Sequence, residues 1–236
     1  MNKRELQRTM YELTRPTHMQ RVTLAVIAGA WVLLVWWLLE ANGISFVEKR
    51  VGLSFPDGNT ARRLSLAAAF TIYYVRLLFT LFIFLKRGIG WSEVFTIVPW
   101  LIAIVLLLGI EGGTNPAPFG IAAICGAVLF ILGSWINTHA EYARHRWKQR
   151  AENHGKLYTR GFFRFARHPN YFGDLVSTSG LCLITGKWLT AIVPVLMLAG
   201  FVFINIPVLD AHLRDHYGAA FDDYASRTRK LIPFVY

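Results

Sequence analysis

Long apolar runs alternate with polar segments along this chain, and this pattern predicts helices that cross a membrane. The hydrocarbon core of a bilayer is about 30 Å thick, so a helix needs roughly 20 apolar residues to span it. Runs of this kind occur at about 22–41, 64–86, 92–111, 117–138, 172–187 and 189–208. The fifth run is interrupted by Gly173, Asp174, Gly180 and Gly186, which leaves the number of crossings open by one. The sequence therefore predicts an all-α, polytopic bundle of six or seven transmembrane helices.

The composition supports this reading. Of the 236 residues, 54% are hydrophobic and 17% are charged, which is more apolar material than one soluble domain needs. The first apolar run follows a polar segment of about 21 residues and is too long for a cleaved signal peptide, so we expect it to remain as the first span. Cys125 and Cys182 fall within predicted spans, and we expect neither a disulfide framework nor a metal site.

The formal charge of +11 is explained by topology without nucleic acid. Basic residues gather before the first span, in the turn after the second and in the long 139–171 loop. The first group consists of Lys3, Arg4, Arg8, Arg15 and Arg21, and the turn holds Lys86 and Arg87. Six crossings place these segments and the C-terminal tail on one side, which the positive-inside rule identifies as the cytoplasm.

We therefore expect both termini in the cytoplasm. The chain would form a single transmembrane catalytic domain over 1–236, with 139–171 as a basic cytoplasmic loop and 209–236 as a cytoplasmic tail. The 42–63 loop is an exception to the charge rule, because it carries Lys49, Arg50, Arg62 and Arg63 on the opposite side.

The end of the fourth span and the loop after it hold the first candidate site. Asn137 and Glu141 are four residues apart and share one helical face. Pro169 disfavours helical dihedrals at His168, so the next helix should start there, with Asn170 near its first turn. A helix N-terminus among Arg and Lys side chains suits an anionic ligand such as a nucleotide phosphate. The alternative is that the loop only anchors anionic lipid head groups.

The tail is predicted to form an amphipathic helix from Leu209, closed by an apolar end that returns to the membrane surface. A plain surface helix is the alternative.

Tyr73 and Arg76 form the second candidate site, inside the second span. They are three residues apart and share a helical face. Arg76 precedes Lys86 by ten residues, on the order of 15 Å, which places it near the middle of the bilayer. An ionisable group at that depth costs about 2.5–3.5 kcal/mol on insertion scales and usually faces a cavity or a partner. The structural alternative is an ion pair between Arg76 and a buried acid such as Glu40.

These residues together resemble the steroid 5α-reductase family of membrane NADPH-dependent enone reductases. Residues 133–141 resemble its Gly-x-x-Ile-Asn-x-His-x-acid motif, and residues 170–174 resemble its Asn-Tyr-Phe-Gly-Glu motif. The tail resembles the family's ending, which runs from Phe-x-Asp-Tyr to Leu-Ile-Pro-Phe. The resemblance covers about residues 70–236.

The resemblance implies roles for individual residues. Tyr73 would hydrogen-bond the substrate carbonyl with Arg76 beside it, and Glu40 would stand for the family's N-terminal glutamate. Asn137, Glu141, Lys148, Asn170 and Tyr217 would contact the dinucleotide. The same segments add six further candidates for cofactor binding: Lys156, Arg167, His168, Tyr171, Asp174 and Asp210. Two departures bear on this set, because Lys148 stands where the family commonly has Arg, and Leu213 stands where it has His.

A rival resemblance is to membrane S-adenosylmethionine-dependent methyltransferases of the isoprenylcysteine carboxyl type. The string from Arg167 to Tyr171 fits both groups, but the methyltransferases have paired glutamates where this chain has Leu209-Asp210. The acid after Gly173 favours the reductases. A non-enzymatic lipid-binding or transport protein is a third alternative, in which Arg76 holds an anionic substrate.

We therefore expect a reductase that transfers hydride from NADPH to the C=C bond of a lipophilic, steroid- or isoprenoid-like enone. The cofactor would reach the site from the basic side and the substrate from the lipid. An aimed donor would stabilise the oxyanion that develops on the carbonyl.

Overall fold

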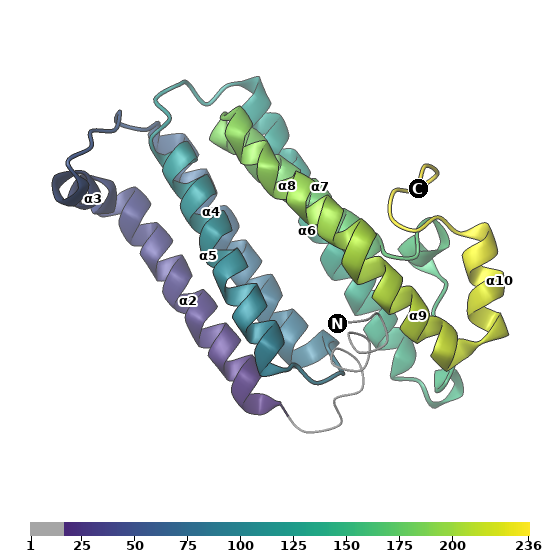
Figure 1. The fold of residues 1–236 in the computed structure, drawn as a ribbon. Coiled ribbons are helices and arrows are strands. Elements are labelled where there is room, and N and C mark those ends of the chain that lie inside the picture. Colours follow the sequence, from purple (N-terminus) through teal and green to yellow (C-terminus); the bar gives the residue numbers. More distant parts are fainter. Residues whose placement is uncertain (1–16) are drawn as a thin grey trace.

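Five helices of the described part of the chain, residues 17–236, are long and apolar enough to cross a membrane (Figure 1). In this computed structural model they run over His18–Glu40 (α2), Thr60–Phe84 (α4, Thr60–Phe79, and η1, Thr80–Phe84), Trp91–Gly113 (α5), Ile121–Lys148 (α6) and Trp188–Tyr217. The last of them joins η4 (Trp188–Ala191), α8 (Ile192–Gly200), η5 (Phe201–Asn205) and α9 (Ile206–Tyr217). No strand occurs in the described range. The prediction of an all-α, multi-pass membrane protein is confirmed.

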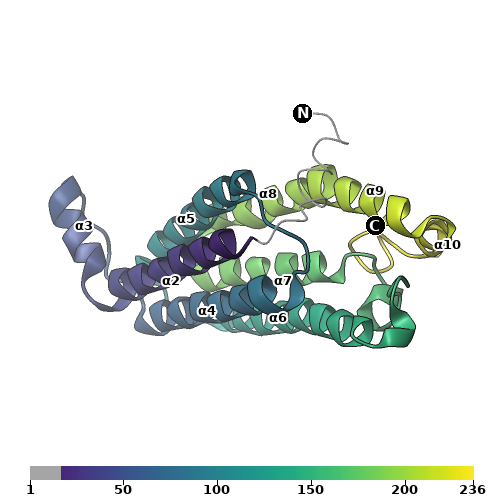
Figure 2. The same cartoon turned by 90° about the horizontal axis from the view of Figure 1, so that it is seen from below.

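The remaining elements are shorter. They are α3 (Gly43–Val51), η2 (Ala151–Asn153), η3 (Gly161–Arg164), α7 (Pro169–Thr185) and α10 (Ala219–Arg227). Helix α7 is the predicted fifth span, but its 17 residues, about 25 Å, leave it outside the five candidate spans. It runs alongside α6 within the bundle (Figure 2). Its start lies with the long loop and the tail, and its end lies at the opposite end of the bundle (Figure 1).

Helix α6 continues well beyond the apolar run that predicted it. Its 28 residues, about 42 Å, exceed the bilayer core, so the first part of the expected 139–171 loop is helical up to Lys148. The last span likewise continues beyond its apolar run, because it extends as α9 into the predicted tail and ends at Tyr217. Hydropathy marked where the apolar side chains end, whereas these helices end only at Lys148 and Tyr217.

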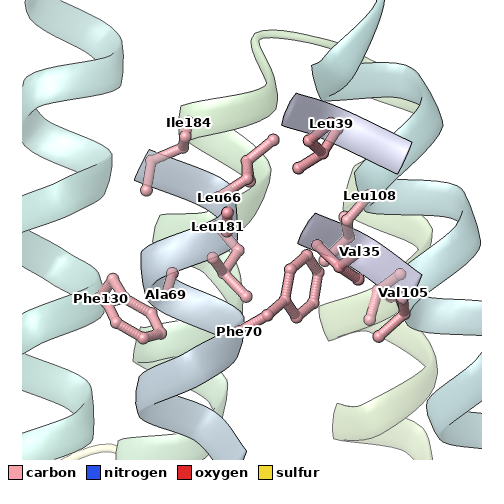
Figure 3. Close-up of a cluster of buried hydrophobic side chains, with 12 residues drawn as sticks. Val35, Leu39, Leu66, Ala69, Phe70, Val105, Leu108, Phe130, Leu181 and Ile184 are labelled. Atoms are coloured by element: carbon pink, nitrogen blue, oxygen red, sulfur yellow. The ribbon is translucent and has the colours of Figure 1, made fainter. Parts of the chain in front are cut away.

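The apolar core lies where α2, α4, α5, α6 and α7 meet. Figure 3 shows the side chains of Val35, Leu66, Phe70, Leu108 and Leu181 directed toward one another. Many other large apolar side chains are exposed on the outside of the bundle, as expected of helices that face lipid. Within lipid, close van der Waals packing is a main source of helix association.

Glycines allow the backbones of α6 and α7 to approach closely. A methyl group added at Gly126 would lie 2.6 Å from the Gly180 carbonyl oxygen, and one at Gly173 would lie 2.6 Å from the main-chain nitrogen of Asn137. The atoms met are backbone atoms, which cannot move aside as a flexible side chain can. The contact therefore fixes the position of α7 along α6.

We expect Gly180→Ala to destabilise the protein by about 1–3 kcal/mol, because the new methyl group would lie 2.5 Å from the Gly126 oxygen. Gly109→Ala on α5 is the matched control, since no atom lies within 4 Å of its added methyl group. Alanine there should be neutral or stabilise the helix by up to about 1 kcal/mol. Thermal unfolding in detergent measures both. Equal effects of the two substitutions would contradict the packing argument.

Polar contacts fix both ends of α7. At one end the buried guanidinium of Arg62 donates to the carbonyl oxygens of Ile184, Ala117 (2.9 Å) and Pro118 (3.1 Å). At the other end the main-chain nitrogens of Arg167 and His168 donate to the tail, at 2.8 and 3.0 Å.

The loop and the tail thus lie together at one end of the bundle, as predicted. The assignment of that end to the cytoplasm stays a prediction. Four of the basic residues on which this assignment rests, Lys3, Arg4, Arg8 and Arg15, lie outside the described range.

Candidate active site

A single cavity of about 890 Å³ collects most of the predicted site residues. The predicted residues that line it are Tyr73, Arg76, Asn137, Glu141, Lys148, Arg167, His168, Asn170, Tyr171, Asp174 and Tyr217. One part, here called the apolar half, is lined from the middle of four helices by Trp31, Phe70, Trp100, Ile104 and Met197. The other part, the polar half, is lined near helix ends by Asn137, Glu141, Arg144, Lys148 and Asn170. Tyr73, Arg76 and Asp174 also line the cavity.

The hydroxyl of Tyr73 is held by two residues of α7. Its oxygen lies 2.7 Å from Ser177 Oγ and 2.9 Å from Thr178 Oγ1. Ser177 is fully buried and Thr178 is 3% exposed. The ring of Tyr73 packs against Phe130 of α6, with 5.6 Å between the centroids. The position of this hydroxyl is therefore fixed by contacts to two helices.

Arg76 pairs with Asp174 of α7, and Glu40 is not its partner. Arg76 donates to Asp174 Oδ1 at 2.8 Å and to Ser134 Oγ at 3.1 Å. The guanidinium carbon also lies 4.9 Å from the centroid of the Tyr73 ring, within the range of a cation–π contact. Tyr73 and Arg76 thus share a helical face, as predicted. The ion pair of Arg76 and Asp174 is neutral overall.

Asn137 and Glu141 both line the cavity, as their spacing on one helical face predicted. Asn137 donates its amide hydrogen to the carbonyl oxygen of Asn170 at 3.0 Å, which ties α6 to the first turn of α7. Glu141 forms an ion pair with Arg144, one turn further along α6. The turn predicted before Pro169 is confirmed, since His168 has φ −125° and ψ 59° and Pro169 begins α7.

Lys148 joins the end of α6 to the end of α9. Its ammonium group donates to the hydroxyl of Tyr217 at 2.5 Å and lies 5.1 Å from the centroid of that ring. Lys86, from the turn after the second span, lines the same cavity.

Arg167, His168 and Asp210 form a buried cluster beside the polar half. Arg167 donates to Asp210 Oδ2 at 2.9 Å and to the Thr228 carbonyl oxygen at 2.7 Å, and His168 Nε2 lies 2.9 Å from Asp210 Oδ1. Both carboxylate oxygens of Asp210 are therefore engaged. This cluster fastens α9 and the tail to the start of α7.

The burial of His168 makes stability depend on pH. Desolvation lowers the pKa of His168 below its usual value of 6.5, and the hydrogen bond to Asp210 offsets this only in part. The unfolded chain then binds more protons than the folded one between the lowered pKa and 6.5, so stability rises with pH across that window. This contribution is complete above about pH 6.5 and is lost as the pH falls through the lowered pKa.

We expect His168→Gln to flatten the acid side of the stability profile, because glutamine retains a donor near the Nε2 position and does not titrate. Thermal unfolding in detergent between pH 5 and 7.5 measures the change. His154→Gln, at an exposed position, should leave the profile as it is. A His168→Gln profile that follows the wild type would exclude this origin.

Three predicted residues lie outside the lining of the cavity. Glu40 ends α2 and lines a separate polar pocket of about 140 Å³ with Glu48 and Arg63. Lys156 is exposed on the long loop, and Asp210 is held in the cluster with Arg167 and His168. The structure brings none of these three to Tyr73.

Three residues that hydrogen-bond Tyr73 or Arg76 were not predicted from the sequence: Ser177, Thr178 and Ser134. Ser177 and Thr178 follow Asp174 by three and four residues, so they share its helical face. Following that face from Asp174 would have found them. Ser134 and Arg144 have similar positions relative to Asn137 and Glu141 on α6.

Comparison with known proteins identifies a family to which the sequence is similar. The sequence pattern of a family described as "Protein of unknown function (DUF1295)" matches residues 91–228, which is more than half of the chain.

Two kinds of curated enzyme are similar to about half of this chain. Protein-S-isoprenylcysteine O-methyltransferase B of Arabidopsis thaliana is 30% identical over 115 residues, which cover 47% of this chain and 58% of that protein. 3-Oxo-5-alpha-steroid 4-dehydrogenase 2 of Homo sapiens is 29% identical over 111 residues, covering 47% of this chain and 42% of the relative. Steroid 5-alpha-reductase DET2 of Gossypium hirsutum is 27% identical over 119 residues, which cover 48% of this chain and 42% of that protein.

The chain thus matches about half of the length of these relatives. The resemblance to steroid 5α-reductases, and their link to isoprenylcysteine methyltransferases, is confirmed.

Proposed function

The chain belongs to the DUF1295 family, and from this premise we propose that it is a membrane-embedded, NADPH-dependent reductase of lipophilic enones. The observation that carries the proposal is the position of Tyr73. Tyr73 lines a cavity whose one half is basic and polar and whose other half is apolar, and its hydroxyl is held by Ser177 and Thr178. A hydride donor in the first half and a lipophilic acceptor in the second would meet beside this hydroxyl.

The polar half fits an anionic dinucleotide. Lys86, Arg144 and Lys148 line the cavity, and neither lysine forms an ion pair with an acidic side chain of the part of the chain that the structure describes. The first turn of α7 adds backbone donors near Asn170, and a helix N-terminus favours phosphate. When bound, NADPH would supply the hydride. We propose that this end of the bundle faces the cytoplasm, where the cofactor is available.

The apolar half fits a lipophilic substrate. Trp31, Phe70 and Trp100 give it aromatic walls, and Met197 adds a flexible one. The cavity volume of about 890 Å³ lies near the upper end of the roughly 300–1,000 Å³ found for small-molecule sites, which suits two ligands that meet. The chemical class, a steroid- or isoprenoid-like enone, is proposed from the relatives named as a 3-oxo-5-alpha-steroid 4-dehydrogenase and a steroid 5-alpha-reductase.

Tyr73 would act on the substrate oxygen. Negative charge develops on the enone oxygen as hydride reaches the β-carbon, and a fixed donor in a water-poor cavity stabilises that charge. Arg76 packs on the Tyr73 ring and is held by Asp174, so it positions the ring and adds a favourable dipole.

Two contacts favour reduction over methyl transfer. Arg76 is neutralised by Asp174 and is therefore poorly suited to hold a substrate carboxylate. Asp210, the acid at the position of the methyltransferases' glutamates, has both oxygens engaged by Arg167 and His168. The relatives include methyltransferases at similar identity, so S-adenosylmethionine belongs in the test.

We expect NADPH, and not S-adenosylmethionine, to raise the melting temperature of the detergent-solubilised protein. A ligand that binds only the folded state at 100 times its Kd adds about 2.7 kcal/mol to stability. Lys148→Ala should reduce the NADPH effect because Lys148 lines the cavity. Lys156→Ala, which removes the same charge from an exposed position, should leave it unchanged. Stabilisation by S-adenosylmethionine alone would overturn the proposal.

A further inference from the structure

The two hydroxyl groups beside Tyr73 form a chain whose direction follows from counting protons. Each hydroxyl carries one hydrogen to donate. Ser177 Oγ donates to the main-chain oxygen of Asp174 at 3.0 Å, so it must accept from Tyr73. Thr178 then donates to the Tyr73 oxygen. The order is Thr178 to Tyr73 to Ser177 to the Asp174 carbonyl.

In this direction the only proton of Tyr73 points into α7 and away from the cavity. A substrate oxygen would therefore meet a hydroxyl whose hydrogen is already engaged. Tyr73 can donate to the substrate only if its bond to Ser177 is replaced.

Ser177 can turn without leaving a buried group unsatisfied. The oxygen that it would release, the Asp174 carbonyl, lies within α7 and also accepts the helical N–H four residues later. Ser177 can then donate to the Tyr73 oxygen instead. Its full burial keeps water from taking its place, and it does not line the cavity.

We propose that Ser177 is a positioning residue that reverses its hydrogen bond when a substrate oxygen binds. Ser177 accepts from Tyr73 in the resting state and donates to Tyr73 in the complex. Tyr73 then aims its proton at the substrate oxygen, with Ser177 and Thr178 both donating behind it. Because hydrogen bonds in a chain polarise one another, the two donors strengthen the bond that Tyr73 makes. This inference rests on the proposed function, in which Tyr73 donates to a carbonyl.

The test uses a 4-en-3-one steroid labelled with ¹³C at its carbonyl, bound to the full chain without cofactor. Infrared difference spectra measure how far the carbonyl stretch moves to lower wavenumber in the wild type relative to Tyr73→Phe. Ser177→Ala should lose about 10–30% of that shift, the share expected for one cooperative bond. Thr178→Val should lose a similar share, and Thr178→Ser should restore it. With NADPH, Ser177→Ala should lower kcat and leave KM unchanged.

Thr71→Val is the matched control. Thr71 lies on α4 two residues from Tyr73 and donates to the Ala67 carbonyl at 2.9 Å, but it does not line the cavity. Its removal should leave the carbonyl shift unchanged. Equal shifts in the wild type and Tyr73→Phe would overturn the proposed function and this inference with it. A shift that depends on Tyr73 but is unchanged in Ser177→Ala would overturn the role of Ser177 alone.

Discussion

Tyr73→Phe should lower kcat by about 10²–10³-fold while NADPH still raises the melting temperature. The substitution removes only the hydroxyl, and the phenyl ring can keep its contacts with Phe130 and the Arg76 guanidinium. The lost group is the donor aimed at the place where oxyanion charge would develop. Initial rates of NADPH oxidation with a 4-en-3-one steroid measure the first effect, and thermal unfolding measures the second.

Tyr74→Phe is the matched control for this experiment. Tyr74 is the next residue on α4 and also lines the cavity, but its ring lies against Gly29 of α2 and its hydroxyl forms no hydrogen bond with Ser177 or Thr178. Its substitution should change kcat far less than Tyr73→Phe. A Tyr73→Phe enzyme that loses cofactor binding as much as turnover would contradict the assigned role.

Asp174→Ala should destabilise the protein by about 3 kcal/mol, because it leaves the charge of Arg76 without its partner inside the bundle. The side chain of Arg76 is 11% exposed and that of Asp174 is 26% exposed, so the pair is largely shielded from solvent. The double variant Arg76→Met with Asp174→Ala removes both charges and should be less destabilised than Asp174→Ala alone. Thermal unfolding in detergent measures all three proteins.

The surface pair of Arg227 and Asp223 provides the control. Its atoms lie 2.6 Å apart, closer than the 2.8 Å of the buried pair, but both side chains are about two-thirds exposed. Asp223→Ala should therefore cost no more than about 1 kcal/mol. If Asp223→Ala and Asp174→Ala lowered stability by similar amounts, burial would not explain the contribution of the pair of Arg76 and Asp174.

Local features of the site were readable from the sequence because they depend on near neighbours in the chain. The spacing of Tyr73 and Arg76, and that of Asn137 and Glu141, fixes a shared face on any regular helix. Pro169 likewise fixed the start of α7 through its effect on the preceding residue. The partner of Arg76 could not be predicted in this way. Glu40 and Asp174 are both acidic residues within predicted spans, and no rule based on neighbours in the chain distinguishes them.

The lengths of the helices could likewise be predicted from the sequence only in part. Hydropathy located the apolar part of each span, but it set the end of α6 ten residues too early. Polar residues can continue a helix beyond the lipid as long as backbone hydrogen bonds are satisfied. The 17-residue α7 was the weakest span by hydropathy, yet its glycines give it the closest packing against α6.

The sequence by itself determined that this protein is an all-helical, multi-pass membrane protein with Tyr73 and Arg76 on one face of a span. It could do so because lipid demands long apolar runs and the helix repeat fixes which neighbours share a face. Only the tertiary structure decided that Arg76 pairs with Asp174, that Glu40 lies away from the cavity and that Ser177 and Thr178 hold Tyr73. Those contacts join residues about 100 positions apart, and they depend on how closely the backbones of α4, α6 and α7 pack.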